Sequence, residues 1–117
     1  MRADVKRSEW PTFLQEFGER NKMRPTRLEV TSKSGEVSTD FWLEDGLPLM
    51  GTSLDSDGED APHVHIMLDG DTSHDARHLT HAVARVRRVG REAGDIGRDI
   101  ALEVEDEGGS VTILRFE

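Results

Sequence analysis

Turn signals recur at a nearly constant interval through the middle of this chain. Four glycines are separated by eleven or twelve residues, and each follows a serine or an aspartate: Gly35, Gly46, Gly58 and Gly70. Ser-Gly and Asp-Gly pairs favour tight turns between antiparallel strands. The spacing therefore predicts an antiparallel meander, of the kind found in barrels and sandwiches.

The segments between these turns alternate apolar and polar residues, which is the pattern of half-buried strands. Alternation of this kind covers residues 28–31, 37–43, 47–54 and 64–68, and it returns in 100–104 and 111–116. Residues 76–91 fit both a strand alternation and a helical spacing of their leucine and valines. Periodicity alone leaves both structures open there.

One helix is expected ahead of the strands. Four large apolar residues follow the spacing i, i+3, i+4, i+7 of a single helical stripe: Trp10, Phe13, Leu14 and Phe17. Pro11 suits a first turn, and Asn21 suits a helix end. The helix should span about residues 9–21 and the meander about residues 26–117.

These elements predict one α+β domain over residues 1–117, a length that fits a single core. The helix should pack on a strongly bent antiparallel sheet of six to seven strands. Closure into an SH3-like or Sm-like small barrel is one way to bend such a sheet. The expected core consists of Phe13, Phe17, Leu28, Val30, Leu49, Ile66, Leu68, Leu102, Val104 and Ile113.

Charge is segregated along the chain. The net charge is −9, yet residues 34–76 hold eleven acidic side chains without a lysine or arginine, and residues 77–98 hold six arginines. The overall acidity argues against unaided nucleic-acid binding. Four of these arginines could form an anion-binding or RNA-binding edge, or could face the acidic strands: Arg85, Arg87, Arg88 and Arg91.

All five histidines fall between residues 63 and 81. Imidazoles at short spacings can bind a divalent transition metal, provided that three or four ligands converge. The candidate ligands are His63, His65, His78 and His81. The alternative is that these histidines are partly exposed residues on strands. No other cofactor is indicated.

Several classes of function lack their motifs in this sequence. There is no cysteine, no G-x-S-x-G nucleophile elbow and no P-loop, so a non-enzymatic role is favoured. No apolar run reaches the ~18 residues of a membrane span, and no secretory signal is visible. We therefore expect a cytoplasmic protein without a membrane partner.

Three segments together resemble a family of small bacterial proteins classed as domains of unknown function, family 5335. They are W10-x-x-F13-L14-x-x-F17, G46-L47-P48-L49-x-G51 and V111-T112-I113-L114-R115-F116. His78-x-x-His81 matches the middle segment of that family, and the resemblance implies an extended strand over residues 79–88. The resemblance to this family implies no particular activity.

A binding or assembly module, self-associating or with a protein partner, is thus the leading expectation for function. A histidine-based metal protein is the first alternative, and an Sm-like RNA-binding module is the second.

Overall fold

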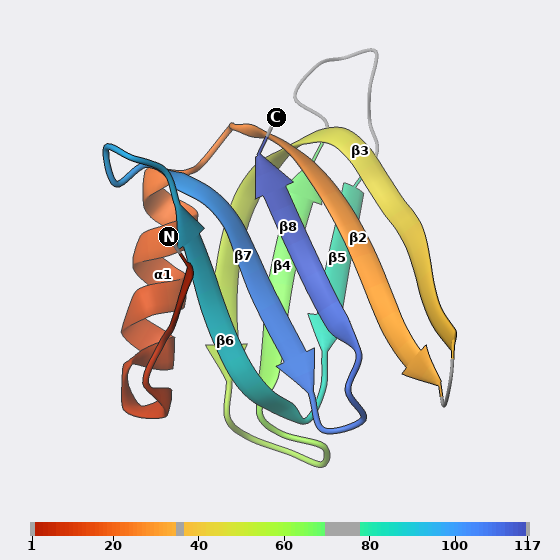
Figure 1. Cartoon of the computed structure of the whole chain (residues 1–117). Helices are drawn as coiled ribbons and strands as arrows, with labels where there is room; N and C mark the ends of the chain where they lie inside the picture. The colour runs from red at the N-terminus through yellow and green to blue at the C-terminus, as the bar shows by residue number, and fades with distance from the viewer. Residues whose placement is uncertain (1, 35–36, 70–77, 117) are drawn as a thin grey trace.

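Figure 1 shows the computed structural model, which describes residues 2–34, 37–69 and 78–116, with the backbone alone for 32–34, 37–45 and 78. The elements are β1 (Arg2–Asp4), the 3-10 turn η1 (Arg7–Glu9), α1 (Trp10–Arg20), β2 (Pro25–Ser34), β3 (Val37–Asp55), β4 (His63–Asp69), β5 (His78–Val83), β6 (Val86–Ala93), β7 (Asp99–Asp106) and β8 (Val111–Phe116). The strands form one antiparallel sheet in the order β1-β6-β7-β8-β2-β3-β4-β5. The predicted α+β class is confirmed.

Strand β3 folds this sheet into two layers. Residues 37–48 of the strand pair with β2, whereas residues 49–55 pair with β4. The turn predicted at Gly46 is wrong, because this glycine lies inside one continuous strand of 19 residues. Its φ of +94° suits glycine, and the register with β2 shifts at this point. The resulting bulge bends the strand where a hairpin was expected.

The sheet is open, so the expected SH3-like or Sm-like barrel closure is wrong, and eight strands replace the six or seven expected. In the described chain, β1 and β5 each pair with a single neighbour. Strand β5 lies across the interior from β8, with His81 facing Thr112, and Figure 1 shows β4 and β5 behind β7 and β8. Side chains fill the space between the layers, which keeps the backbones too far apart for the pairing that closure needs.

The described part of segment 76–91 contains strands β5 and β6, so the helical alternative is excluded for it. Only Ala84 and Arg85 separate the two strands, and Arg85 has a φ of +50°. The N–H of Arg85 donates a hydrogen bond to the carbonyl oxygen of Asp60 at 2.7 Å. This short connection carries the chain from the back layer to the front layer.

Helix α1 packs against the second half of β3. The predicted stripe is buried at Trp10, Leu14 and Phe17, and the helix ends at Arg20 with Asn21 as its C-cap, close to the predicted end. The Thr52 hydroxyl donates a hydrogen bond to the Leu14 carbonyl oxygen. The helix approaches so closely that a Cβ atom on Gly18 would lie 2.6 Å from the Thr52 nitrogen. Glycine is therefore required at this crossing.

Seven residues of the predicted core are fully buried: Phe17, Leu28, Leu49, Ile66, Leu68, Leu102 and Val104. The other three predicted core residues, Phe13, Val30 and Ile113, are half-buried. In β8 the buried apolar residue is Leu114, which pairs with Leu28 on one side and Leu102 on the other. Both faces of β8 carry apolar residues, so alternation alone could not select the face that points inward.

Candidate functional site

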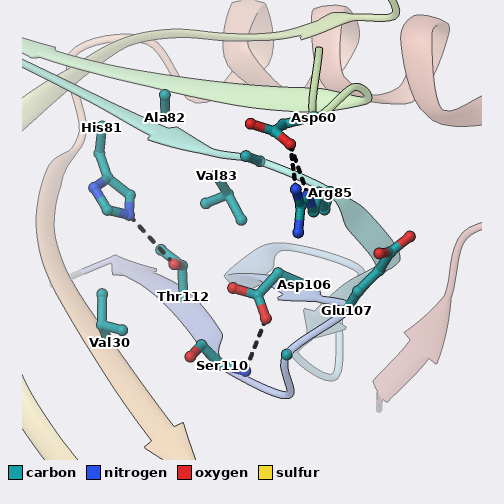
Figure 2. A pocket seen from close by; sticks show the side chains of 12 residues that line it. Val30, Asp60, His81, Ala82, Val83, Arg85, Asp106, Glu107, Ser110 and Thr112 are labelled. Carbon is teal, nitrogen blue, oxygen red and sulfur yellow. Dashed lines mark hydrogen bonds and ion pairs between the residues drawn. The ribbon is translucent and has the colours of Figure 1, made fainter.

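A groove of about 540 Å³ lies between β5 and the opposing strands β2 and β8. Figure 2 shows His81 of β5 and Thr112 of β8 directed toward one another, with Val30 of β2 beside them. The lining residues are Val30, Asp60, His81, Ala82, Val83, Ala84, Arg85, Asp106, Glu107, Gly108, Ser110 and Thr112. The groove is thus apolar along its strands and charged at the end formed by the loops.

His81 is the titratable side chain of the apolar part of the groove. It pairs across the sheet with Ile66, so it shares the inward face of that buried residue. Its Nε2 lies 3.3 Å from Thr112 Oγ1, and burial lowers the pKa of His81 below 6.5. Burial thus favours the neutral imidazole. A neutral imidazole beside a hydroxyl can donate or accept hydrogen bonds.

At the loop end of the groove, one arginine pairs with a carboxylate and a second carboxylate binds a main-chain N–H. Arg85 Nε donates to Asp60 Oδ1 at 2.8 Å, and Asp106 Oδ1 accepts a hydrogen bond from the Ser110 N–H at 3.0 Å. Among the described residues no carboxylate hydrogen-bonds to His81, so the groove lacks the acid–histidine–hydroxyl arrangement of nucleophilic catalysis.

The candidate metal ligands do not share one face of the sheet. His65 pairs with Ala82 on the face opposite to His81, and the rings of His63 and His65 lie 6.2 Å apart. Nδ1 of His63 is buried without a hydrogen-bond partner among the described residues. The side chain of His78 lies outside the described residues. Within the described part of the chain, no group of three or more His, Asp or Glu side chains could hold a metal.

The four arginines of the predicted patch all contact carboxylates within the fold. Arg85 pairs with Asp60, Arg87 pairs with Glu105, and Arg91 pairs with Asp99. Arg88 has three carboxylate partners, of which the nearest is Asp4 at 3.0 Å. Most of these partners belong to β7, so the basic strand β6 and the acidic strand β7 neutralise each other.

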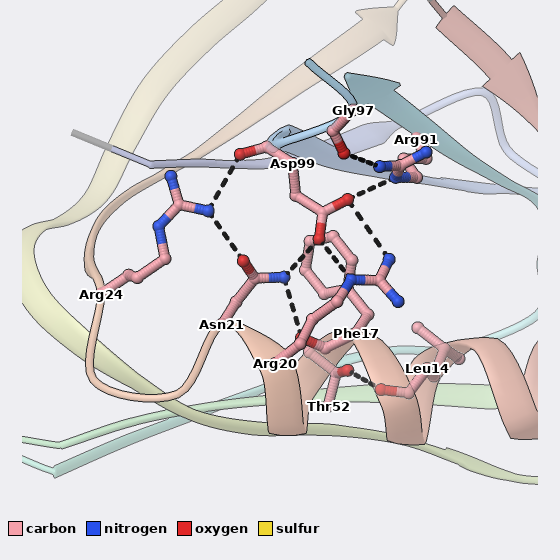
Figure 3. Close-up of polar contacts among 9 residues, drawn as sticks. All are labelled: Leu14, Phe17, Arg20, Asn21, Arg24, Thr52, Arg91, Gly97 and Asp99. Carbon is pink, nitrogen blue, oxygen red and sulfur yellow. Dashed lines mark hydrogen bonds and ion pairs between the residues drawn. The ribbon is translucent and has the colours of Figure 1, made fainter. Parts of the chain in front are cut away.

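The sequence did not predict the cluster of polar side chains around Asp99. Arg20 Nε and Asn21 Nδ2, both at the end of α1, donate to Asp99 Oδ2 at 2.6 and 2.7 Å, and Arg91 of β6 also donates to this carboxylate (Figure 3). Burial alone would raise the pKa of Asp99, but these hydrogen bonds outweigh it and lower the pKa to about 2. No local signal could reveal the cluster, because Arg20 and Asp99 are 79 residues apart.

No family model, curated protein or solved structure matches this chain. Among the described residues, α1 is too short and too polar to cross a membrane.

Proposed function

We propose that this chain is a non-enzymatic binding and assembly module that self-associates along the outer edge of β5, which pairs only with β4 in the described part of the chain. The supporting observation is the contrast between the two edges of the sheet. Edge strands are usually protected by short length, by charged residues or by proline. The six residues of β5, His-Leu-Thr-His-Ala-Val, include no proline, lysine, arginine or acidic residue. The other edge, β1, has three residues, and Arg2 and Asp4 hold it to the sheet by ion pairs.

The groove next to β5 supports the same proposal. Strand addition draws affinity from main-chain hydrogen bonds and specificity from pockets beside the edge. Val83 and His81 project from β5 into a groove whose far wall holds Val30 and Thr112. A second copy could align its own β5 antiparallel to the first about a two-fold axis, so that each edge covers the other.

Light scattering across a concentration series tests the proposal. The wild-type chain should be a dimer at high concentration. Thr80→Lys adds a charge to the exposed side of β5 and should yield a monomer, because a lysine on each of two paired edges is repulsive. Thr12→Lys, the matched control on the exposed face of α1, should stay dimeric. A monomeric wild type at about 1 mM, or equal dissociation of both variants, would contradict the proposal.

Hydrogen exchange locates the contact within the molecule. Amides of β5 should become protected on dimerisation, whereas amides of β1 should not. Protection of α1 alone would assign the contact to the helix and overturn the edge-strand proposal.

The metal-binding alternative has one supporting observation, the unpartnered Nδ1 of His63. Metal analysis of protein purified without a histidine tag, with a zinc thermal-shift assay, tests it. The RNA-binding alternative is weakened by the carboxylate partners of the predicted arginine patch, because paired guanidinium groups are less available to phosphates. Absence of RNA retention at low salt would remove it. Membership of family 5335 and a cytoplasmic location stay predictions.

A further inference from the structure

A second pocket, of about 330 Å³, opens at the C-terminal end of α1. There the connection from α1 to β2 meets the loop between β6 and β7, and the pocket is lined by Arg20, Asn21, Arg24, Gly97, Arg98 and Asp99. Three of these six residues are arginines and one is acidic. The pocket is therefore locally basic on a chain whose net charge is −9.

The one carboxylate of this pocket is already engaged. Asp99 accepts hydrogen bonds from Arg20, Asn21 and Arg91, and Figure 3 shows these donors surrounding it. It therefore has little capacity to neutralise the remaining two arginines of the pocket.

Arg24 is held in place by neutral groups. Its Nη1 donates to Asn21 Oδ1 at 2.7 Å and to the main-chain oxygen of Asp99 at 2.9 Å (Figure 3). Its guanidinium carbon lies 4.0 Å from the centre of the Phe116 ring. In the described part of the chain, no carboxylate forms an ion pair with Arg24. These contacts orient the guanidinium group without an ion pair, and the nearby charge of Asp99 offsets only part of its positive charge.

Arg98 lines the same pocket from the β6–β7 loop, and its side chain is exposed. No ion pair joins it to a described carboxylate. Burial lowers the pKa of Arg24, the positive charge of Arg98 lowers it further, and the negative charge of Asp99 opposes these two effects. Two guanidinium groups thus repel each other across a pocket, and an anion between them would relieve that repulsion.

We propose that this pocket binds a phosphate group between Arg24 and Arg98, with Arg20 at its wall. Guanidinium groups bind phosphate oxygens through paired, charge-assisted hydrogen bonds, and they do so better than a point charge. Arg20 and Arg24 come from the end of α1 and the segment that follows it, and Arg98 comes from the β6–β7 loop. Hydrogen bonds from Asn21 and Arg24 to Asp99 tie these two segments together and hold Arg24 in place.

The surroundings of the pocket indicate that the ligand also has an apolar part. The exposed large hydrophobic residues of the described chain are Met23, Ile96 and Ile100, and all three lie in or beside the loops that form the pocket. Ile96, at the tip of its loop, is 89% exposed. The apolar part of a phosphate ester, or the acyl chains of a phospholipid, would contact Met23 and Ile96 beside the pocket, whereas Ile100 follows the buried Asp99 in β7 and faces the other way.

Calorimetric titration with inorganic phosphate tests the pocket. Saturable 1:1 binding is expected, with a Kd of about 1 mM. Arg98→Gln should weaken it about tenfold, because it removes one charge-assisted contact from an exposed side chain that the fold does not need. Lys6→Gln is the matched control, since it removes an exposed positive charge at the opposite end of α1. Absence of saturation up to about 20 mM phosphate, or equal weakening in both variants, overturns the proposal.

Vesicle sedimentation distinguishes the two sources of phosphate. Vesicles of phosphatidylcholine with phosphatidic acid should be compared with vesicles of phosphatidylcholine alone. Sedimentation only with phosphatidic acid, reduced by Arg98→Gln and by Ile96→Ser, identifies a headgroup. Phosphate binding without sedimentation identifies a soluble phosphate ester. Sedimentation that Arg98→Gln leaves unchanged contradicts the proposed pocket.

Discussion

Replacing Asp99 by asparagine tests whether the end of α1 is tied to the sheet by charge. Asp99 is 3% exposed and joins Arg20 and Asn21 of the helix end to Arg91 of β6. Asparagine keeps the size of the side chain but removes its charge and one of its two acceptor oxygens. Two guanidinium groups then lose their anionic partner at a buried position.

The magnitude follows from the pKa of Asp99, which falls from 3.8 to about 2 on folding. Each pKa unit corresponds to about 1.36 kcal/mol, so the ionised carboxylate contributes about 2.5 kcal/mol to the free energy of unfolding. Because the folded-state pKa is the lower one, this contribution is fully present above pH 3.8. It is lost as the pH falls through about 2.

Urea denaturation followed by circular dichroism measures this contribution. At pH 7 Asp99→Asn should lower the free energy of unfolding by about 2.5 kcal/mol. Between pH 4 and pH 2 its stability should fall less steeply than that of the wild type. Some slope should persist, because hydrogen bonds from Arg87 and Arg88 lower the pKa of Glu105 against the effect of its burial. Asp57→Asn, an exposed control, should match the wild type. A loss below about 0.5 kcal/mol, or parallel pH profiles, would refute the reasoning.

Three further predictions concern packing and protonation. Gly18→Ala should destabilise the fold by about 2 kcal/mol in thermal melts, because the added Cβ would clash with the Thr52 backbone. The same change usually stabilises an exposed helix. A stabilised variant would therefore disprove the close approach of α1 to β3. In urea denaturation, Leu114→Ala should lower the free energy of unfolding by about 3 kcal/mol and Ile113→Ala by about 1 kcal/mol, because only Leu114 is fully buried. The reverse order would refute the register of β8. Burial lowers the pKa of His81, so the unfolded chain takes up the proton first and stability should decline as the pH falls below 6.5. An NMR titration should place the midpoint of His81 below 6.5, and His81→Gln should remove the loss of stability that protonation of His81 causes. A midpoint at or above 6.5 would contradict this prediction.

The elements that the sequence predicts correctly depend on neighbours along the chain. The stripe from Trp10 to Phe17 specifies a helix that Asn21 caps, and alternation in residues 64–68 and 100–104 specifies two strands. Each of these patterns is complete within a few residues, so no distant contact is needed to interpret it.

The incorrect predictions depend on contacts between distant residues. Asp-Gly at 45–46 has the composition of a turn, yet pairing with β2 on one side and β4 on the other keeps it within β3. Ile113 and Leu114 are equally apolar, and only their cross-strand partners decide that Leu114 faces the core. Local propensity yields to tertiary packing at both places.

The same distinction between local patterns and distant contacts applies to the candidate sites. The sequence by itself determined that this chain has one N-terminal helix, many short antiparallel strands, clustered histidines and segregated charge, because these features are local. Only the tertiary structure decided that the arginines of β6 meet acids of β7, that His81 faces inward and His65 outward, and that Arg24 and Arg98 share a pocket. The physical reason is that a binding site is a convergence of side chains, and convergence is set by how the sheet bends and which edges it leaves open.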